Sequence, residues 1–147
     1  MNDELVLTFV AEQVSARAHL LREQAPRTCD GVLALLPLTL RAHHAIYSGS
    51  EIATILPEVV RLDPENSTSE VSPGDLAFVW LEEGSHYGVD RDFSELCWFY
   101  DIDARPSMFE GPGKVSVFAK LSNADEFFAV CRRMRIEGAK EIEIRRA

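Results

Sequence analysis

Three polar side chains that lie close together in the sequence have the types needed for a reactive or ligand-binding site. His44, Ser48 and Glu51 supply an imidazole, a hydroxyl and a carboxylate. A carboxylate can orient an imidazole so that the imidazole removes the proton of a serine hydroxyl, which activates the serine as a nucleophile. The same groups can instead hydrogen-bond a polar ligand. The sequence therefore leaves open ligand binding and catalysis with His44 as a general base.

The alternation of side chains along the segment before Ser48 predicts where the imidazole points. Apolar side chains recur at every second position, at Leu40, Ala42 and Ile46, and His44 falls in the same series. Successive residues of a strand face opposite sides, so His44 is expected on the apolar face. There it is either a core histidine with both ring nitrogens bonded or the base of a pocket.

Aromatic residues in the predicted strands are expected to form the walls of this pocket. We assign Tyr47, Trp98 and Tyr100 to the ligand-binding set with the three polar residues, although aromatic residues in strands most often fill a core. His43 and His44 are adjacent and would face opposite sides of a strand, which disfavours a shared metal ion. We expect no metal and no cofactor.

Strands account for most of the elements that must position these residues. Alternating apolar and polar residues, or short apolar runs, predict seven of them. These strands cover residues 5–10, 14–20, 38–47, 76–81, 96–100, 115–121 and 141–145, and an extended stretch is expected at 52–56.

Two helices complete the prediction. Apolar residues at helical spacing follow Pro26 and stop before Pro37, and a second such series follows a capping signature at Ser122 and ends at Gly138. Residues 63–75, 82–92 and 108–114 have the composition of loops. The sequence thus predicts a mostly β fold, a closed or partly closed β-barrel with two helices at its ends.

Length and composition indicate one folded domain over residues 1–147. The chain is 46% hydrophobic and 27% charged, far from the composition of disordered proteins. Edges of a partly closed barrel, among them the strand at 141–145, would allow a homodimer.

The charge of the chain excludes two classes of partner. Its 15 basic and 24 acidic residues give a net charge of −9, which repels phosphate backbones and anionic lipids. Neither nucleic acid nor a membrane is expected as a partner. The three cysteines contain no CxxC pair and the N-terminus is acidic, so we expect buried thiols and a cytoplasmic protein.

Four short motifs follow one another along the chain. They are Leu36-Pro37 after the first helix, the run from His44 to Gly49 followed by Glu51, the run Glu65-Asn66-Ser67-Thr68, and the run Ser72-Pro73-Gly74-Asp75-Leu76. In these motifs and their order the sequence resembles an uncharacterised bacterial family, a domain of unknown function with a cyclophilin-like β-barrel. The chain departs from that pattern at 82–92, which is long and polar, and at 107–113. The resemblance implies a small barrel with a pocket formed partly by residues 44–49, and it implies no established activity.

A cyclophilin-like shape does not by itself bring prolyl isomerase activity. The isomerase groove of cyclophilins uses an arginine on a strand, a glutamine and an aromatic floor. The only glutamines here, Gln13 and Gln24, precede the middle strands. We therefore expect binding of a polar small molecule or a short peptide near His44, and the alternative is a hydrolase or an isomerase, including a peptidyl-prolyl isomerase-like activity.

Overall fold

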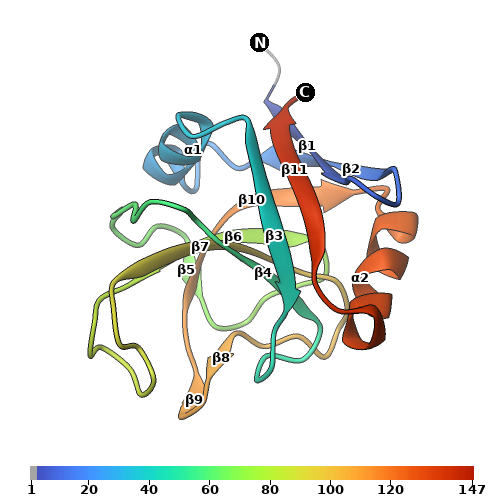
Figure 1. The fold of residues 1–147 in the computed structure, drawn as a ribbon. Coiled ribbons are helices and arrows are strands. Elements are labelled where there is room, and N and C mark those ends of the chain that lie inside the picture. The colour runs from blue at the N-terminus through green and yellow to red at the C-terminus, as the bar shows by residue number, and fades with distance from the viewer. Residues whose placement is uncertain (1–2) are drawn as a thin grey trace.

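Eight antiparallel strands form a closed barrel in the computed structural model, which describes residues 3–147 (Figure 1). Around the barrel the order is β2-β1-β11-β3-β4-β7-β6-β10, and pairing of β10 with β2 closes it. The predicted mostly β barrel with two helices is confirmed. The strands are β1 (Glu4–Phe9), β2 (Val14–Leu20), β3 (Leu38–His44), β4 (Glu51–Ile55), β6 (Asp75–Leu81), β7 (Phe93–Phe99), β10 (Val115–Ser122) and β11 (Lys140–Arg146).

Alternation along the strands separates the two faces of the barrel wall. The inward series on β1, Leu5, Leu7 and Phe9, is fully buried, and the inward residues Ile142 and Ile144 of β11 pack in the same core. A second apolar cluster lies on the outer face of β6, β7 and β10. The outer face is therefore also covered in this region, by segments that lie outside the barrel.

Both helices bury one side against the barrel core. Helix α1 (Pro26–Leu33) contributes Cys29 and Val32, and helix α2 (Asp125–Glu137) contributes Phe127 and Cys131. The predicted position of each helix is confirmed, as is the end of α2 at Gly138. The predicted side-chain cap at the start of α2 is wrong, because Ala124 occupies the N-cap position and makes no side-chain hydrogen bond there.

The segment that carries the predicted site leaves the barrel earlier than expected. Strand β3 ends at His44, and Ile46 is 84% exposed instead of facing the core. Three very short strands occur in predicted loops: β5 (Ser67–Thr68), which pairs with β10, and β8 (Ser107–Met108) and β9 (Gly111–Pro112), which form a small hairpin. This hairpin projects below the barrel in Figure 1.

Strand β11 does not offer the free edge that was expected for a homodimer. It pairs with β1 on one side and with β3 on the other. The expectation of a free edge at 141–145 is therefore wrong, because both edges of that strand are already hydrogen-bonded, and a homodimer stays a prediction. No helix among residues 3–147 has the length and apolar character needed to cross a membrane.

Candidate functional site

His44 is bonded through both of its ring nitrogens. Its Nδ1 lies 2.8 Å from the carbonyl oxygen of Ala45, so this nitrogen carries the proton and donates. Its Nε2 then accepts from the hydroxyl of Tyr100 at 2.6 Å. Burial lowers the pKa of His44 below its usual 6.5, and the nearby Arg135 acts in the same direction. The ring is therefore held neutral, with no ring nitrogen free to accept a further proton.

Glu51 lies on the opposite face of the barrel wall from His44. The partner of His44 across strands β3 and β4 is Ile52, whose side chain is fully buried in the core. Glu51 precedes Ile52 and so points outward. The structure therefore does not bring the imidazole and the carboxylate of the predicted site together.

Ser48 stays near Glu51 and anchors the hairpin β8–β9. Its Oγ accepts from the main-chain N–H of Ser107 at 2.9 Å and lies 3.2 Å from the carbonyl oxygen of Ser107. The Ser48 hydroxyl also opposes the rise in the pKa of Glu51. Of the three polar residues predicted from the sequence, two thus share one region.

The predicted aromatic walls are dispersed. Trp98 is 0% exposed and lies in the core, where its indole N–H is 3.4 Å from Sγ of Cys131. Tyr100 is also buried, and its hydroxyl donates a hydrogen bond to His44. Tyr47 is exposed, and its ring packs edge-on against Phe109. Trp98 therefore fills the core, which is the more common role of aromatic residues in strands.

Two carboxyl groups and a thiol meet on the outer face of β4 and β7. Glu51, Glu95 and Cys97 each offer an atom that lies within 4.8 Å of the other two. Cys97 pairs with Ala53 across the two strands, so the side chains of Glu51 and Glu95 reach it from opposite directions along the sheet. No salt bridge from a Lys or Arg of residues 3–147 reaches either carboxyl group.

The electrostatics of this cluster favour its protonated forms. Burial, and then the charge of Glu51, raise the pKa of Glu95 from 4.5 to about 8. Burial raises the pKa of Glu51, which is 5% exposed. Burial and the two carboxylates raise the pKa of Cys97 well above 9.0. Two close carboxyl groups without a cation cannot both ionise cheaply, so the pair retains a proton at neutral pH.

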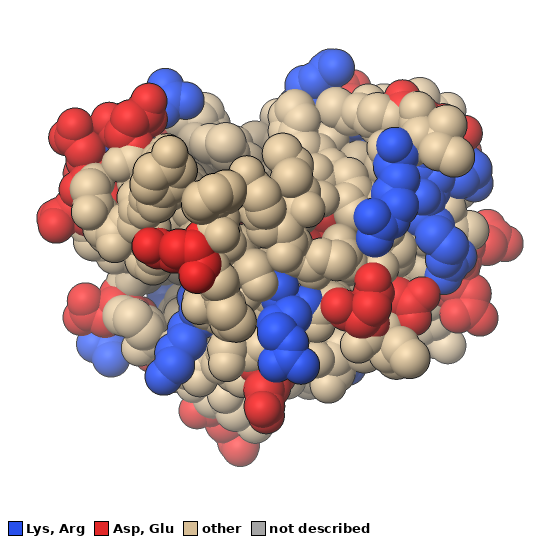
Figure 2. Space-filling model, turned by 90° about the horizontal axis from the view of Figure 1, so that it is seen from below, with Lys and Arg blue, Asp and Glu red and all other residues tan. Residues whose placement is uncertain are grey.

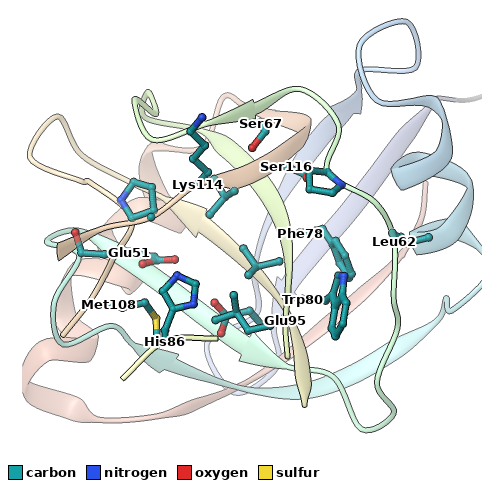
Figure 3. A pocket seen from close by; sticks show the side chains of 17 residues that line it. Glu51, Leu62, Ser67, Phe78, Trp80, His86, Glu95, Met108, Lys114 and Ser116 are labelled. Atoms are coloured by element: carbon teal, nitrogen blue, oxygen red, sulfur yellow. The ribbon is translucent and has the colours of Figure 1, made fainter. Parts of the chain in front are cut away.

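Both glutamates line a cavity of about 480 Å³, which we call the glutamate pocket (Figure 3). In Figure 3, Glu51 and Glu95 lie near His86 and Met108, while Phe78 and Trp80 lie on the other side of the pocket. The guanidinium of Arg61 stands 5.3 Å from the centre of the Trp80 ring. The remaining labelled lining residues are Leu62, Ser67, Lys114 and Ser116. The pocket thus combines apolar and aromatic walls with an acidic floor, an arrangement typical of small-molecule sites.

His44 borders a different and more polar hollow. That second cavity, of about 390 Å³, is lined by His43, His44 and Arg135 together with Ala45, Met134, Gly138 and Ala139. His44 and the two glutamates therefore belong to separate cavities.

Sequence reasoning missed Glu95 altogether. The available signal was a carboxylate inside the apolar run from Phe93 to Phe99, because an acidic residue in a buried strand is uncommon without a partner. That it meets Glu51 depends on the register of β4 against β7, which no local spacing encodes. The same register assembles the one group of three described residues able to hold a metal ion, where the sequence predicted no metal.

The sequence from residue 7 to residue 145 matches the model of a family described as "Protein of unknown function (DUF3830)". The chain belongs to the DUF3830 family. The expected membership of a family of unknown function is confirmed, and the matched region of DUF3830 contains both glutamates of the pocket. A search of curated proteins finds no match to this chain.

Solved structures similar to this DUF3830 chain establish its fold. McbB in complex with tryptophan superposes with a TM-score of 0.68 at 15% identity, over 97% of this chain and 44% of McbB. The hypothetical protein AF2241 from Archaeoglobus fulgidus gives 0.63 at 20% identity, over 99% of this chain and 95% of that one. A cyclophilin-type peptidyl-prolyl cis-trans isomerase from Cryptosporidium parvum, studied in the presence of the dipeptide Ala-Pro, gives 0.57 at 14% identity, over 98% of each chain. The cyclophilin-like fold is thereby confirmed, and this chain spans less than half the length of McbB.

Proposed function

We propose that the protein binds a small organic amine in the glutamate pocket, with the ammonium group held by Glu51 and Glu95. The observation that carries this proposal is a pair of crowded carboxyl groups that form no salt bridge with a Lys or Arg of residues 3–147. A ligand ammonium supplies the missing positive charge and hydrogen-bond donors. Burial of the pair raises the cost of leaving it unneutralised.

The walls of the pocket define the rest of the ligand. Phe78, Val79, Trp80 and Leu81 line one side, and they suit an apolar or aromatic group attached to the amine. A cavity of about 480 Å³ falls in the size range of pockets for small molecules. The structural neighbour McbB is known in complex with tryptophan, a molecule that combines an ammonium with an aromatic ring.

This proposal keeps two of the residues predicted from the sequence and moves the centre of the site. Glu51 binds the ligand, and Ser48 supports Glu51 and the hairpin beside it. His44 would have to give up the hydrogen bond that Nε2 accepts from Tyr100 before acting as a general base for a hydrolase or an isomerase. We therefore place the polar small molecule expected near His44 in the glutamate pocket instead.

Calorimetry with matched probes tests the proposal. Tryptamine, 3-methylindole and indole-3-acetate share an aromatic ring and differ in charge, and tryptamine alone is expected to bind. Because the carboxyl pair is partly protonated when empty, binding at pH 7 should release up to about one proton, seen as a dependence of the heat on buffer ionisation. Equal binding of the three compounds would contradict the proposal.

Variants localise the binding. Glu51→Gln and Glu95→Gln keep the shape of each side chain and remove its charge, and each is expected to weaken tryptamine binding by about ten-fold or more. Glu23→Gln, at an exposed site in the turn before α1, is the matched control and should bind as the native protein does. If the two pocket variants bind tryptamine normally, the amine does not contact the glutamates.

A divalent metal ion is the second candidate, favoured by the position of the Cys97 thiol. One thiolate and two carboxylates are ligands that Zn²⁺ accepts, and the two glutamates also line the glutamate pocket. Cobalt(II) reports thiolate ligation by a charge-transfer absorption in the near ultraviolet. That absorption, lost in Cys97→Ser and kept in Cys131→Ser, would favour the metal, whereas tryptamine binding that persists in Cys97→Ser favours the amine.

A further inference from the structure

Two arms from opposite ends of one strand meet over the glutamate pocket. The loop 82–92 leads into the start of β7, and the hairpin β8–β9 follows its end after a short connection. Glu95 and Cys97 lie on β7 between these two points. His86 from the loop and Met108 from the hairpin both line the pocket. We call the loop and the hairpin together the roof.

Each arm of the roof is held together by its own hydrogen bonds. In the loop, Gly84 N–H donates to the carbonyl of Val89 at 2.8 Å, and Glu83 N–H donates to Oδ1 of Asp92 at 2.8 Å. In the hairpin, Gly113 N–H donates to the carbonyl of Pro106 at 2.8 Å. Each arm therefore has its own defined structure.

Aromatic rings connect the two arms to each other. The ring of Phe109, at the tip of the hairpin, lies 5.1 Å from that of Tyr87 in the loop and 5.8 Å from that of Tyr47. These three rings are exposed by 69% at Tyr87, 63% at Phe109 and 54% at Tyr47. Within residues 3–147, no hydrogen bond or salt bridge joins the loop 82–92 to the hairpin.

The surrounding surface agrees with a contact made mainly by uncharged atoms. Figure 2 shows the end of the molecule from which the hairpin projects, and uncharged atoms cover much of its middle, with acidic and basic side chains around them. Apolar ring contacts lack directional bonds, so they can separate and re-form without leaving a buried polar group unpaired.

We propose that the roof is a gate, with Phe109 as the latch that closes it against Tyr87 and Tyr47. Opening the gate admits a ligand to the glutamate pocket, and closing it shields the carboxyl pair from water. This inference depends on the geometry of the roof and holds whichever ligand the pocket takes.

Thiol labelling measures the opening without any ligand. Val79 lines the pocket on β6 beside Glu95, so Val79→Cys places a reporter thiol under the roof. A neutral maleimide is added, and peptide mass spectrometry gives the labelling rate of the reporter. Cys131, fully buried in the core, is the internal reference for global unfolding.

Removing the latch should speed labelling of the reporter alone. In the Val79→Cys background, Phe109→Ala and Tyr87→Ala are each expected to raise its rate about three- to ten-fold, the change expected for losing one or two aromatic contacts. Tyr87→Phe keeps the ring and should leave the rate unchanged. Ile102→Ala, an 88% exposed apolar site on the neighbouring connection, is the matched control.

Two results would overturn the gate. The first is an unchanged reporter rate in both ring-deleted variants. The second is a rate that rises in step with that of Cys131, because the variants would then loosen the whole fold. Since no amine is present, failure here leaves the proposed ligand class untouched, and failure of tryptamine to bind leaves the gate untouched.

Discussion

The hydroxyl of Tyr100 donates to Nε2 of His44 across 2.6 Å, which ties the end of β3 to the residue that follows β7. Because Nδ1 is also bonded, the imidazole acts as a polar strut between two strands that are separated by β4. Tyr100 is buried and His44 is half-buried, so breaking this hydrogen bond would leave a partly buried polar group without a partner and lower the stability of the barrel.

Tyr100→Phe removes the donor to His44 and should lower the free energy of unfolding by about 1–3 kcal/mol, the cost of a buried unsatisfied group. Urea denaturation measures the loss. Tyr47→Phe, whose hydroxyl is at an exposed position, is the matched control and should change little. Equal stability of the two variants would show that the hydrogen bond to His44 has no energetic weight.

The imidazole of His44 is expected to titrate below pH 6.5. Burial lowers its pKa in the folded protein, so the unfolded chain takes up a proton at a higher pH than the folded one does. The contribution of His44 to stability is therefore present above pH 6.5 and is lost as the pH falls through the folded pKa. A two-dimensional NMR titration of the His44 ring protons measures this pKa. A value above 6.5 would contradict a neutral imidazole in the folded protein.

The carboxyl of Glu95 should make the protein less stable as the pH rises. Its pKa is raised from 4.5 to about 8, so the folded state holds a proton that the unfolded state has lost between these values. In that window the free energy of unfolding should fall by up to about 1.4 kcal/mol per pH unit from this group.

Glu95→Gln removes this dependence and should be more stable than the native protein at pH 9. Urea denaturation at pH 5, 7 and 9 measures the difference between the two proteins, and Glu23→Gln controls for the loss of one surface charge. A difference that stays constant over this range would show that Glu95 ionises normally.

Ser48→Ala should loosen the hairpin β8–β9. The change removes the acceptor of the Ser107 N–H and the donor to the Ser107 carbonyl, and both groups then depend on water. We expect faster hydrogen exchange in residues 105–113, by about ten-fold, and a stability loss of about 1 kcal/mol. Ser50→Ala is the matched control, since the Ser50 hydroxyl only accepts a long 3.4 Å bond from Arg135. Unchanged exchange in the hairpin would contradict an anchoring role for Ser48.

Glu65 caps helix α1 from a distant loop. Its carboxylate accepts from the main-chain N–H of Thr28 at 2.7 Å and from the Thr28 hydroxyl at 2.8 Å, while Ala25 at the N-cap offers no side-chain bond. Burial raises the pKa of Glu65, but the bonds from Thr28 and Arg27 outweigh it and lower the pKa below 4.5. These contacts give Glu65 a structural role.

Glu65→Gln should cost about 1–2 kcal/mol at pH 7, a usual effect of weakening a helix cap. Because the folded pKa is depressed, the contribution of the carboxylate is present above pH 4.5 and disappears as the pH falls through the folded value. Thermal unfolding at pH 7 and pH 3 measures both parts, with the exposed Glu70→Gln as control. If Glu65→Gln is destabilised as much at pH 3 as at pH 7, the ionised carboxylate of Glu65 does not cap the helix.

The strands could be predicted because their periodicity is local. Leu38, Leu40 and Ala42 alternate with polar residues, and the structure makes them strand β3. The same alternation continues to Ile46, yet the chain turns away after His44 because Ala45 N–H bonds to the carbonyl of Glu51 and begins a bend. A period of two thus predicts the existence of the strand better than its end.

The site could be predicted only in part, since its members meet through strand register. Glu51 and Ser48 belong to one local segment, and sequence reasoning placed both in a site. Glu95 lies more than forty positions further along, on a strand whose alignment with β4 is set by the whole barrel. His44 was grouped with Glu51 by proximity in the chain, whereas the direction of successive side chains separates them.

Strand β11 fills the place between β1 and β3, so the barrel wall stays incomplete until residues 140–146 have been synthesised. While a ribosome is still producing residues beyond helix α2, β1 and β3 each expose a row of unpaired backbone groups that only β11 can occupy. A chain truncated after residue 139 would therefore have two unpaired strand edges and a core open on one side, which favours aggregation.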